Sequence, residues 1–455
     1  MYQAALTVVA PIAGSELDRL RAVLASIKDQ VQRRQLGSDD RALIPFGELT
    51  TVHFARFVVL DPPADEPGAP ALLLFATSYD GSRVRHLREL IEVAGKGLEE
   101  VFSHCTDFRS DRSGELGDRL RRFFASHSQE PSAFWVGHPR RTVYQIYAES
   151  KLHAELEREL GRSSGRLCSQ PFAYALRCVS ERGDLRWALS PPDRTRVPWL
   201  RKALRLGAFG LGMLALLPVL AAWLVCIRVL ELYGDRKPPA YTEPALLQAR
   251  ERFDHHKRAL LEDEDLGLED EDLGVQNQMT AVSEIKPGRL RLATLRVVLW
   301  AVDFLGRNYW DNGHLHGIRT IHFARWFVVK QGKTRRLVFF SNYDGSWEKY
   351  LGEFIDQAAN GLTGIWSNTV RILASDTPGE PDVVPFPKTR WLLRAGARRE
   401  AKFKRFVRAC QVRTQVWYSA YPKLSVLNVQ NNSQLRRGLQ GLRGLEERRA
   451  WLRRL

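Results

Sequence analysis

Apolar and polar positions along the chain form a pattern that occurs twice. Each half begins with a short apolar run and continues into a stretch with apolar residues at helical spacing. Two runs with strand-like alternation follow, then a second helical stretch and a last short apolar run. The pattern therefore predicts the order strand, helix, strand, strand, helix, strand in each half.

The residues themselves repeat as well as the pattern. TVHFARFVV and TIHFARWFVV share a His-Phe-Ala-Arg motif, and LLLFATSYDGS and RLVFFSNYDGS share Tyr-Asp-Gly-Ser. His53 and His322 are 269 positions apart, and Asp80 and Asp344 are 264 apart. These matches predict an internal duplication. The matching segments are 51–59 with 320–329, 72–82 with 336–346, and 133–147 with 416–430.

The predicted order of elements is that of a ferredoxin-like unit, whose antiparallel sheet has helices on one face only. Two copies can cover each other's open faces by packing sheet against sheet. The sequence resembles the dimeric α/β-barrel superfamily, which includes dye-decolorizing peroxidases, chlorite dismutases and small monooxygenases. Its motifs resemble an uncharacterised bacterial membrane-associated family more closely than those enzymes. We therefore expect an α+β protein whose two tandem ferredoxin-like modules form a dimeric α/β-barrel-like pair.

A hydrophobic segment separates the two copies. Residues 206–227 carry no charge, and 22 helical residues extend about 33 Å, roughly the thickness of a bilayer core. The flank before this segment is more basic than the flank after it, which predicts a membrane protein with its N-terminal module in the cytoplasm. Pro218 leaves a re-entrant segment as an alternative, and a buried core helix is a third. We expect no signal peptide before the first copy.

The same features divide the chain into five parts. If the segment crosses the membrane, the modules lie on opposite sides and must pair between chains as a homodimer. A re-entrant segment lets them pair within one chain. The predicted parts are the first module at 1–190, the basic flank and hydrophobic segment at 191–237, an acidic linker at 238–275, the second module at 276–435 and a basic C-terminal helix at 436–455.

Candidate site residues lie in the shared motifs. Strand alternation places His53 on one face of its strand and Arg56 on the other. A buried His or Arg needs a partner, and the next strand offers Asp80, for a His–Asp hydrogen bond or an Arg–Asp pair. The Asp-Gly-Ser sequence also suits a turn followed by a helix cap. The candidate catalytic residues are His322, Arg325, Tyr343 and Asp344, and the candidate pocket residues are His53, Arg56, Tyr79, Asp80, Asn342 and Trp347.

Composition limits the classes of molecule that the protein is expected to bind. The five cysteines lack CxxC spacing, so we expect neither a disulfide framework nor a metal site. The net charge of +16 favours an anionic partner. An RNA-binding RNP pattern is absent from the sequence, and beside a membrane segment acidic lipid is the simpler anion. Membrane lipids, and not nucleic acid, are therefore the expected partners.

Two functional hypotheses follow. In the first, the protein is a membrane-anchored binding or scaffold protein that encloses a hydrophobic, lipid-like small molecule between its paired sheets. In the second, it is an oxidoreductase, haem-dependent or cofactor-free, with His322 and Arg325 at the reacting centre and Asp344 orienting them. The resemblance implies haem beside the sheet, yet only Asp-Gly of the peroxidase Gly-x-x-Asp-Gly motif is present. Duplication of the distinctive residues favours the first hypothesis.

Overall fold

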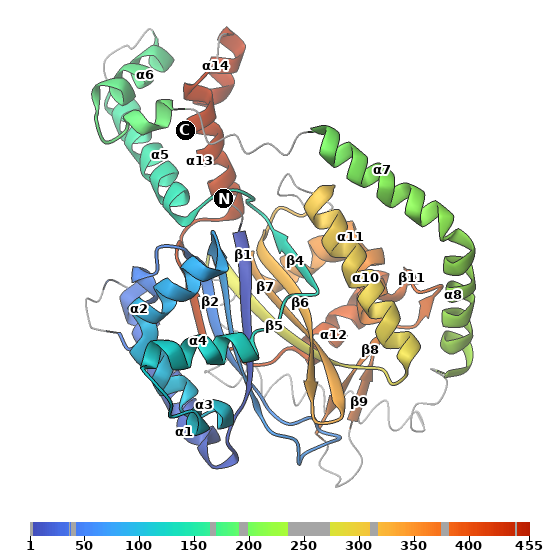
Figure 1. Cartoon of the computed structure of the whole chain (residues 1–455). Helices are drawn as coiled ribbons and strands as arrows, with labels where there is room; N and C mark the ends of the chain where they lie inside the picture. Colours follow the sequence, from blue (N-terminus) through green and yellow to red (C-terminus); the bar gives the residue numbers. More distant parts are fainter. Residues whose placement is uncertain are drawn as a thin grey trace.

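The computed structural model describes residues 3–35, 37, 42–163, 170–190, 199–234, 274–309, 317–374, 382–441 and 444–455. Almost all of the predicted acidic linker at 238–275 lies outside these residues. The described chain is an α+β structure with antiparallel sheets, and helices lie on the outer faces of the two large sheets (Figure 1).

The first half follows the predicted order of elements, with two additional helices before its last strand. The apolar run at the start, the two motif strands and the long amphipathic helices all form where the pattern predicts them. The elements are β1 (Gln3–Pro11), α1 (Leu17–Gln35), β2 (Val52–Leu60), β3 (Leu72–Asp80), α2 (Arg83–Phe102), α3 (Thr106–Ser110), α4 (Leu116–His127) and β4 (Ala133–Val136).

The second half follows the same order, with four short strands and a helix added after its second long helix. Ser82 and Ser346 cap the helices that follow the Asp-Gly-Ser motifs, as predicted. The elements are β5 (Gln276–Ile285), α10 (Arg289–Asn308), β6 (Ile321–Gln331), β7 (Thr334–Asp344), α11 (Trp347–Trp366), β8 (Thr369–Leu373), β9 (Asp382–Pro385), β10 (Thr389–Arg390), β11 (Arg394–Ala395), α12 (Glu400–Cys410) and β12 (Val416–Ser419).

The last strand of each half joins the sheet of the other half. One sheet has the order β1-β3-β2-β12 and the other β4-β6-β7-β5-β8-β9. Just before β4, Ser128 still bridges to Val8 of β1, and just before β12, Gln411 bridges to Ala281 of β5. The two crossing segments therefore link the sheets along both sides.

Side chains from both sheets fill the space between them. The cluster consists of branched and aromatic residues from four strands, two from each half, with Val282 of β5 added. These side chains pack against one another across this part of the interface between the sheets. The residues are Val58, Leu60, Leu72, Leu74, Ala76, Val282, Phe327, Val329, Val338 and Phe340.

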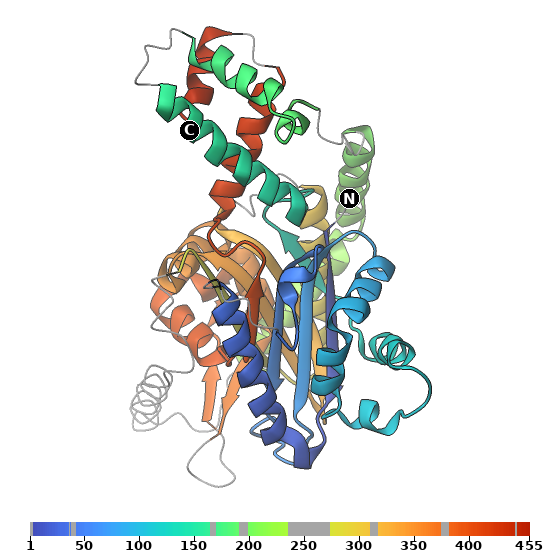
Figure 2. The same cartoon turned by 90° about the vertical axis from the view of Figure 1, so that its left-hand side faces the viewer.

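Four helices form a separate bundle at one end of the sheets (Figures 1 and 2). They are α5 (Val143–Ser163), α6 (Pro171–Glu181), α13 (Val426–Leu439) and α14 (Leu445–Leu452). Trp451 is buried in this bundle and donates from Nε1 to the carbonyl of Leu435. The boundary predicted between residues 435 and 436 therefore falls inside α13, and the C-terminal residues belong to a shared core instead of a separate basic helix.

The hydrophobic segment forms two helices that follow the outer side of α10 (Figure 1). These are α7 (Trp199–Ala215) and α8 (Leu217–Val229). Within the described ranges no one helix has the length and apolar composition of a membrane span. The stretches Ala203–Ala215 and Leu217–Tyr233 meet that test only together, and they are bent by 64°.

Candidate functional site

A β-bulge in each half sets the direction of the motif histidine. In β2 the pairing with β3 passes from Val52 directly to Phe54, so His53 is an extra residue. The same shift occurs around His322 in β6. The bulge overrides strict alternation: His53 and Arg56 both contact side chains or backbone of the other half. The prediction that they occupy opposite faces is therefore wrong.

Six buried side chains from both halves form one chain of hydrogen bonds at the end of the sheets. At its first end, Asp80 Oδ1 lies 3.0 Å from His53 Nε2, and His53 Nδ1 lies 2.8 Å from the Tyr421 hydroxyl. Tyr421 follows β12 and so comes from the opposite half of the sequence. The order along the chain is Asp80, His53, Tyr421, His138, His322 and Asp344.

The second end mirrors the first. The Tyr421 hydroxyl lies 3.1 Å from His138 Nε2, which is 3.3 Å from His322 Nδ1. His322 Nε2 then lies 2.7 Å from Asp344 Oδ1. His138 and Tyr421 occupy corresponding places, since each follows a crossing strand and precedes a proline. The centre of this hydrogen-bond network is thus the place where the two halves of the protein meet.

One assignment of protons satisfies these contacts without a charged histidine. His53 and His322 donate from Nε2 to the two aspartates, which leaves both Nδ1 atoms as acceptors. Tyr421 donates its hydroxyl proton to His53, and His138 Nε2 donates to Tyr421 and His322. Burial, with the neighbouring histidines, holds the pKa of His138 well below its usual value, and burial raises that of Tyr421. Both shifts agree with this assignment.

Each aspartate also fixes the start of a bundle helix. Asp80 Oδ2 accepts from the backbone N–H of Val143 at 2.8 Å, and Asp344 Oδ2 accepts from that of Val426 at 2.7 Å. These are the first residues of α5 and α13. A carboxylate there compensates an unpaired amide and the positive end of the helix dipole. The network therefore joins the sheets to the helical bundle.

Arg56 and Arg325 connect the two sheets at a second place, three residues after the motif histidines. Arg56 donates to the carbonyls of Met279 and Ser341, at 3.0 and 2.9 Å. Arg325 donates to the carbonyls of Leu6 and Thr77 in the other sheet, both at 2.8 Å. Burial lowers the pKa of each guanidinium to about 9. Carbonyls and polar side chains of the opposite sheet are thus the partners, and the alternative Arg–Asp pair does not form.

The other predicted site residues lie elsewhere. Tyr79 and Tyr343 point to the helix-covered faces, where they stack on His86 and Tyr350. Trp347 is buried beneath the guanidinium of Arg408 of α12. Asn342 accepts from Arg56 at 2.6 Å and belongs to the sheet connection. Of the candidate catalytic residues, the structure brings together only His322 and Asp344.

The geometry does not suit haem or metal binding at His322. Both ring nitrogens are engaged, one by Asp344 and one by His138, and the ring is fully buried. Across the described residues, no three His, Cys, Asp or Glu side chains are arranged to hold a metal ion. A haem-ligating histidine needs a free nitrogen facing the group, so His322 does not fit this role.

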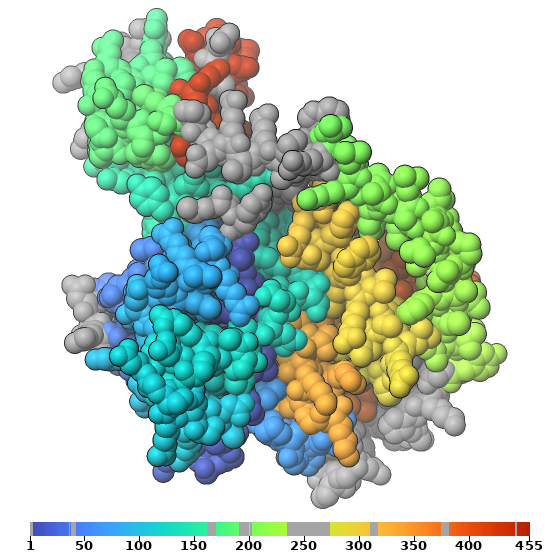
Figure 3. All heavy atoms as spheres, in the orientation of Figure 1, coloured from blue at the N-terminus to red at the C-terminus, as the bar shows by residue number. Residues whose placement is uncertain are grey.

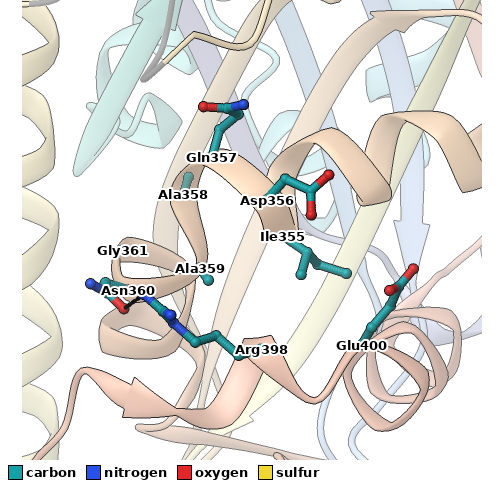
Figure 4. Close-up of a pocket in the computed structure, with 9 residues that line it drawn as sticks. All are labelled: Ile355, Asp356, Gln357, Ala358, Ala359, Asn360, Gly361, Arg398 and Glu400. Atoms are coloured by element: carbon teal, nitrogen blue, oxygen red, sulfur yellow. Dashed lines mark hydrogen bonds between the residues drawn. The ribbon is translucent and has the colours of Figure 1, made fainter.

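An open groove lies away from this network, where α11 is kinked at Ala358 (Figure 4). Its volume is about 410 Å³, and Arg398 reaches across it toward Asn360, 3.4 Å from donor to acceptor. Asp356 and Glu400 also line it. Charged and polar groups of both signs make it a poor site for a lipid-like molecule.

The chain was also compared with known proteins. No family model, curated protein or solved structure matches it.

Proposed function

We propose that the protein is a membrane-anchored scaffold, held at a lipid bilayer by the bent helix pair α7–α8. Its body is then a pair of duplicated ferredoxin-like modules, arranged as a dimeric α/β-barrel within one chain. The observation that carries the proposal is the apolar surface that this helix pair leaves uncovered. The equal order of strands in β1-β3-β2 and β5-β7-β6 supports the duplication.

The exposed surface of the pair is large, and it carries no charged residue between positions 206 and 227. Leu211, five residues before the break at Leu216, is 70% exposed, and nine other large apolar residues of the pair are 40–64% exposed. An apolar patch of this kind marks a contact with a membrane or another protein. The exposed large apolar residues are Leu200, Leu204, Leu211, Met213, Leu214, Leu216, Leu217, Val219, Val225 and Val229.

Among the residues that the structure describes, those of α10 contact one side of the pair. Phe209 stacks on Phe304 of α10 with ring centroids 4.5 Å apart, and Trp223 donates to Thr294 Oγ1 at 2.8 Å. Ile227 is buried, one helical turn beyond Trp223. The remaining sides face outward along the flank of the molecule (Figure 3). This arrangement suits insertion into one leaflet, as expected for a re-entrant segment.

We do not include the enclosed ligand of the first hypothesis, because apolar side chains of the two sheets pack against each other. Nor do we include oxidoreductase chemistry at His322, Arg325 and Asp344. Arg325 binds backbone carbonyls of the other sheet, while His322 and Asp344 belong to a network that is closed by hydrogen bonds. The residues of the motifs therefore support a structural role.

Flotation with vesicles tests the proposal. The purified full chain, diluted from detergent into phosphatidylcholine vesicles, is expected to float with them. Leu211→Glu places a charge on the proposed contact surface, and we expect it to reduce the bound fraction about tenfold or more, since a buried charge is costly there. Val84 of α2, on the other side of the body, is also 70% exposed. Val84→Glu is the matched control and is expected to bind like the original chain. Equal binding of both variants would contradict the anchor.

A further inference from the structure

A second surface element lies beside the helix pair, and its residues differ in kind. The β10–β11 hairpin has Trp391, Leu392 and Leu393 at its tip, between two arginines. Trp391 is 41% exposed and Leu393 is 43% exposed. Exposed Trp and Leu next to Arg is the composition of segments that lie at a membrane interface.

The tip is held in a backbone conformation that large residues avoid. Trp391 and Leu392 have φ of 56° and 59°, in the left-handed region where Gly and Asn are usual. Two consecutive non-glycine residues in this region cost stability. A structure keeps such residues where their side chains are needed, so the apolar tip is a feature that turn formation alone does not explain.

Glu231 fixes the hairpin to the end of the helix pair. Its Oε1 accepts from Thr389 Oγ1 at 2.8 Å and from the Leu392 N–H at 2.9 Å, and its Oε2 accepts from the Trp391 N–H at 3.0 Å. Arg228 of α8 forms an ion pair with the same carboxylate at 2.9 Å. The side chain of Glu231 is buried by these contacts. The hairpin and α8 are thereby one continuous surface.

Two arginines occupy opposite positions in the two strands of the hairpin. Arg390 and Arg394 are directly paired in the antiparallel ladder, and both are exposed. Like charges in this position repel each other. Among the described residues neither arginine forms an ion pair with a carboxylate. An anion between or beside them would relieve the repulsion, and Arg is well suited to phosphate.

We infer that the β10–β11 hairpin is a binding element for anionic phospholipid, with Trp391 and Leu393 in the interface and Arg390 and Arg394 on lipid phosphate. The inference rests on the proposed membrane anchor and adds its lipid preference. The net charge of +16 and the continuity of the hairpin with α8 favour an acidic bilayer over a second copy of this strongly basic chain.

Flotation with two vesicle compositions tests the hairpin separately from the anchor. The full chain is mixed with phosphatidylcholine vesicles, or with an equal mixture of phosphatidylcholine and phosphatidylglycerol. We expect tighter binding to the mixture. Because each arginine near an anionic surface contributes about fivefold, Arg390→Gln with Arg394→Gln is expected to weaken binding to the mixture about 25-fold and leave binding to phosphatidylcholine unchanged.

Arg85→Gln with Arg88→Gln, two exposed arginines of α2, is the control and is expected to keep the preference. Equal binding of the original chain to both vesicles would overturn the lipid assignment and leave the anchor in place. Failure to float with either vesicle would overturn both. A dimer in vesicle-free solution that the hairpin variants dissociate would assign the hairpin to self-association and overturn the inference as well.

Discussion

Corresponding residues of the two halves form the same stacked ring pair, but with different side chains. In the first half His86 stacks on Tyr79 at 3.8 Å, and its Nε2 lies 2.8 Å from Thr77 Oγ1. In the second half a tyrosine takes the place of the histidine and donates to a serine hydroxyl at 2.8 Å. The corresponding residues, each 264 positions apart, are Thr77 and Ser341, Tyr79 and Tyr343, and His86 and Tyr350.

This difference predicts an acid-sensitive site in the first half only. Burial lowers the pKa of His86 from 6.5 to about 3. Between these values the unfolded chain binds a proton that the folded chain does not, so the free energy of unfolding falls as the pH is lowered. We expect His86→Tyr to remove this contribution, roughly 4 kcal/mol at pH 3. Urea unfolding at a series of pH values measures it.

The reciprocal substitution is the control. Tyr350→His places a buried histidine in the second half and is expected to make the acid dependence of the free energy of unfolding steeper. Identical pH profiles for the original chain and both variants would show that these two positions do not determine acid stability.

The hydrogen-bonded chain predicts a structural role for His322. His322→Ala removes the partner of Asp344 Oδ1 and breaks the link to His138. We expect a loss of about 3 kcal/mol in the free energy of unfolding, because a buried carboxylate oxygen loses its hydrogen bond. His127 provides a comparison, because it pairs at 2.8 Å with Asp107, whose carboxylate is exposed. His127→Ala is expected to cost less than about 1 kcal/mol. Equal losses would contradict the role assigned to the buried network.

Part of this site can be predicted from the sequence. The His–Asp hydrogen bond is predictable because neighbouring strands bring the two motifs together. The bulge at His53 is not, since alternation assumes a regular strand. His138 and Tyr421 were missed as site residues, although the repeat aligns them, because a partner in the opposite half cannot be identified from spacing. The partners of the motif histidines, His138 and Tyr421, come close only because β4 and β12 each join the opposite sheet.

At the scale of elements, the crossing segment that contains β4 packs against β6 with no room for a side chain at Gly137. Gly137 follows β4 and donates its N–H to the carbonyl of His322 at 2.8 Å. A Cβ atom at Gly137 would lie 1.8 Å from the carbonyl oxygen of Ile321. The backbone of the crossing segment therefore approaches β6 too closely for any side chain.

Substitution of this glycine tests the crossing. We expect Gly137→Ala to lower the free energy of unfolding by about 2 kcal/mol, because a backbone oxygen must move. Gly95 of α2 is a matched control, since a Cβ there would be 3.7 Å from its nearest neighbour, the side chain of Leu120. Gly95→Ala is expected to stabilise by up to about 1 kcal/mol. A stabilising Gly137→Ala would mean that β4 does not pair with β6 in this way.

The elements and the pairing of consecutive motif strands were largely predictable, and the pairing of β4 and β12 was not. Long helices and motif strands form where hydrophobic periodicity places them. The exchange of β4 and β12 between the sheets could not be predicted, because the sequence of a four-residue strand does not indicate which strand it pairs with. The C-terminal tail was assigned to a separate basic helix because its arginines dominate the composition. Trp451 instead anchors it in a core that α5 and α6 complete.

At the scale of the molecule, strand exchange restricts the membrane topology. The sequence leaves a true span and a re-entrant segment open. Since β4 of the first half lies in the second sheet and β12 lies in the first, the halves cannot occupy opposite sides of a bilayer. If the helix pair α7–α8 inserts into a membrane as proposed, it must enter and leave on the same side.

Labelling of single cysteines tests this topology most directly. Cys168, Cys178 and Cys226 are replaced by serine, while the buried Cys105 and Cys410 remain. A reporter cysteine is introduced in either half at an exposed residue, as Arg88→Cys on α2 or Lys402→Cys on α12. In sealed vesicles from expressing cells, a membrane-impermeant maleimide is predicted to label both reporters to the same extent. Labelling of one reporter before, and of the other only after, the membrane is permeabilised would contradict the account.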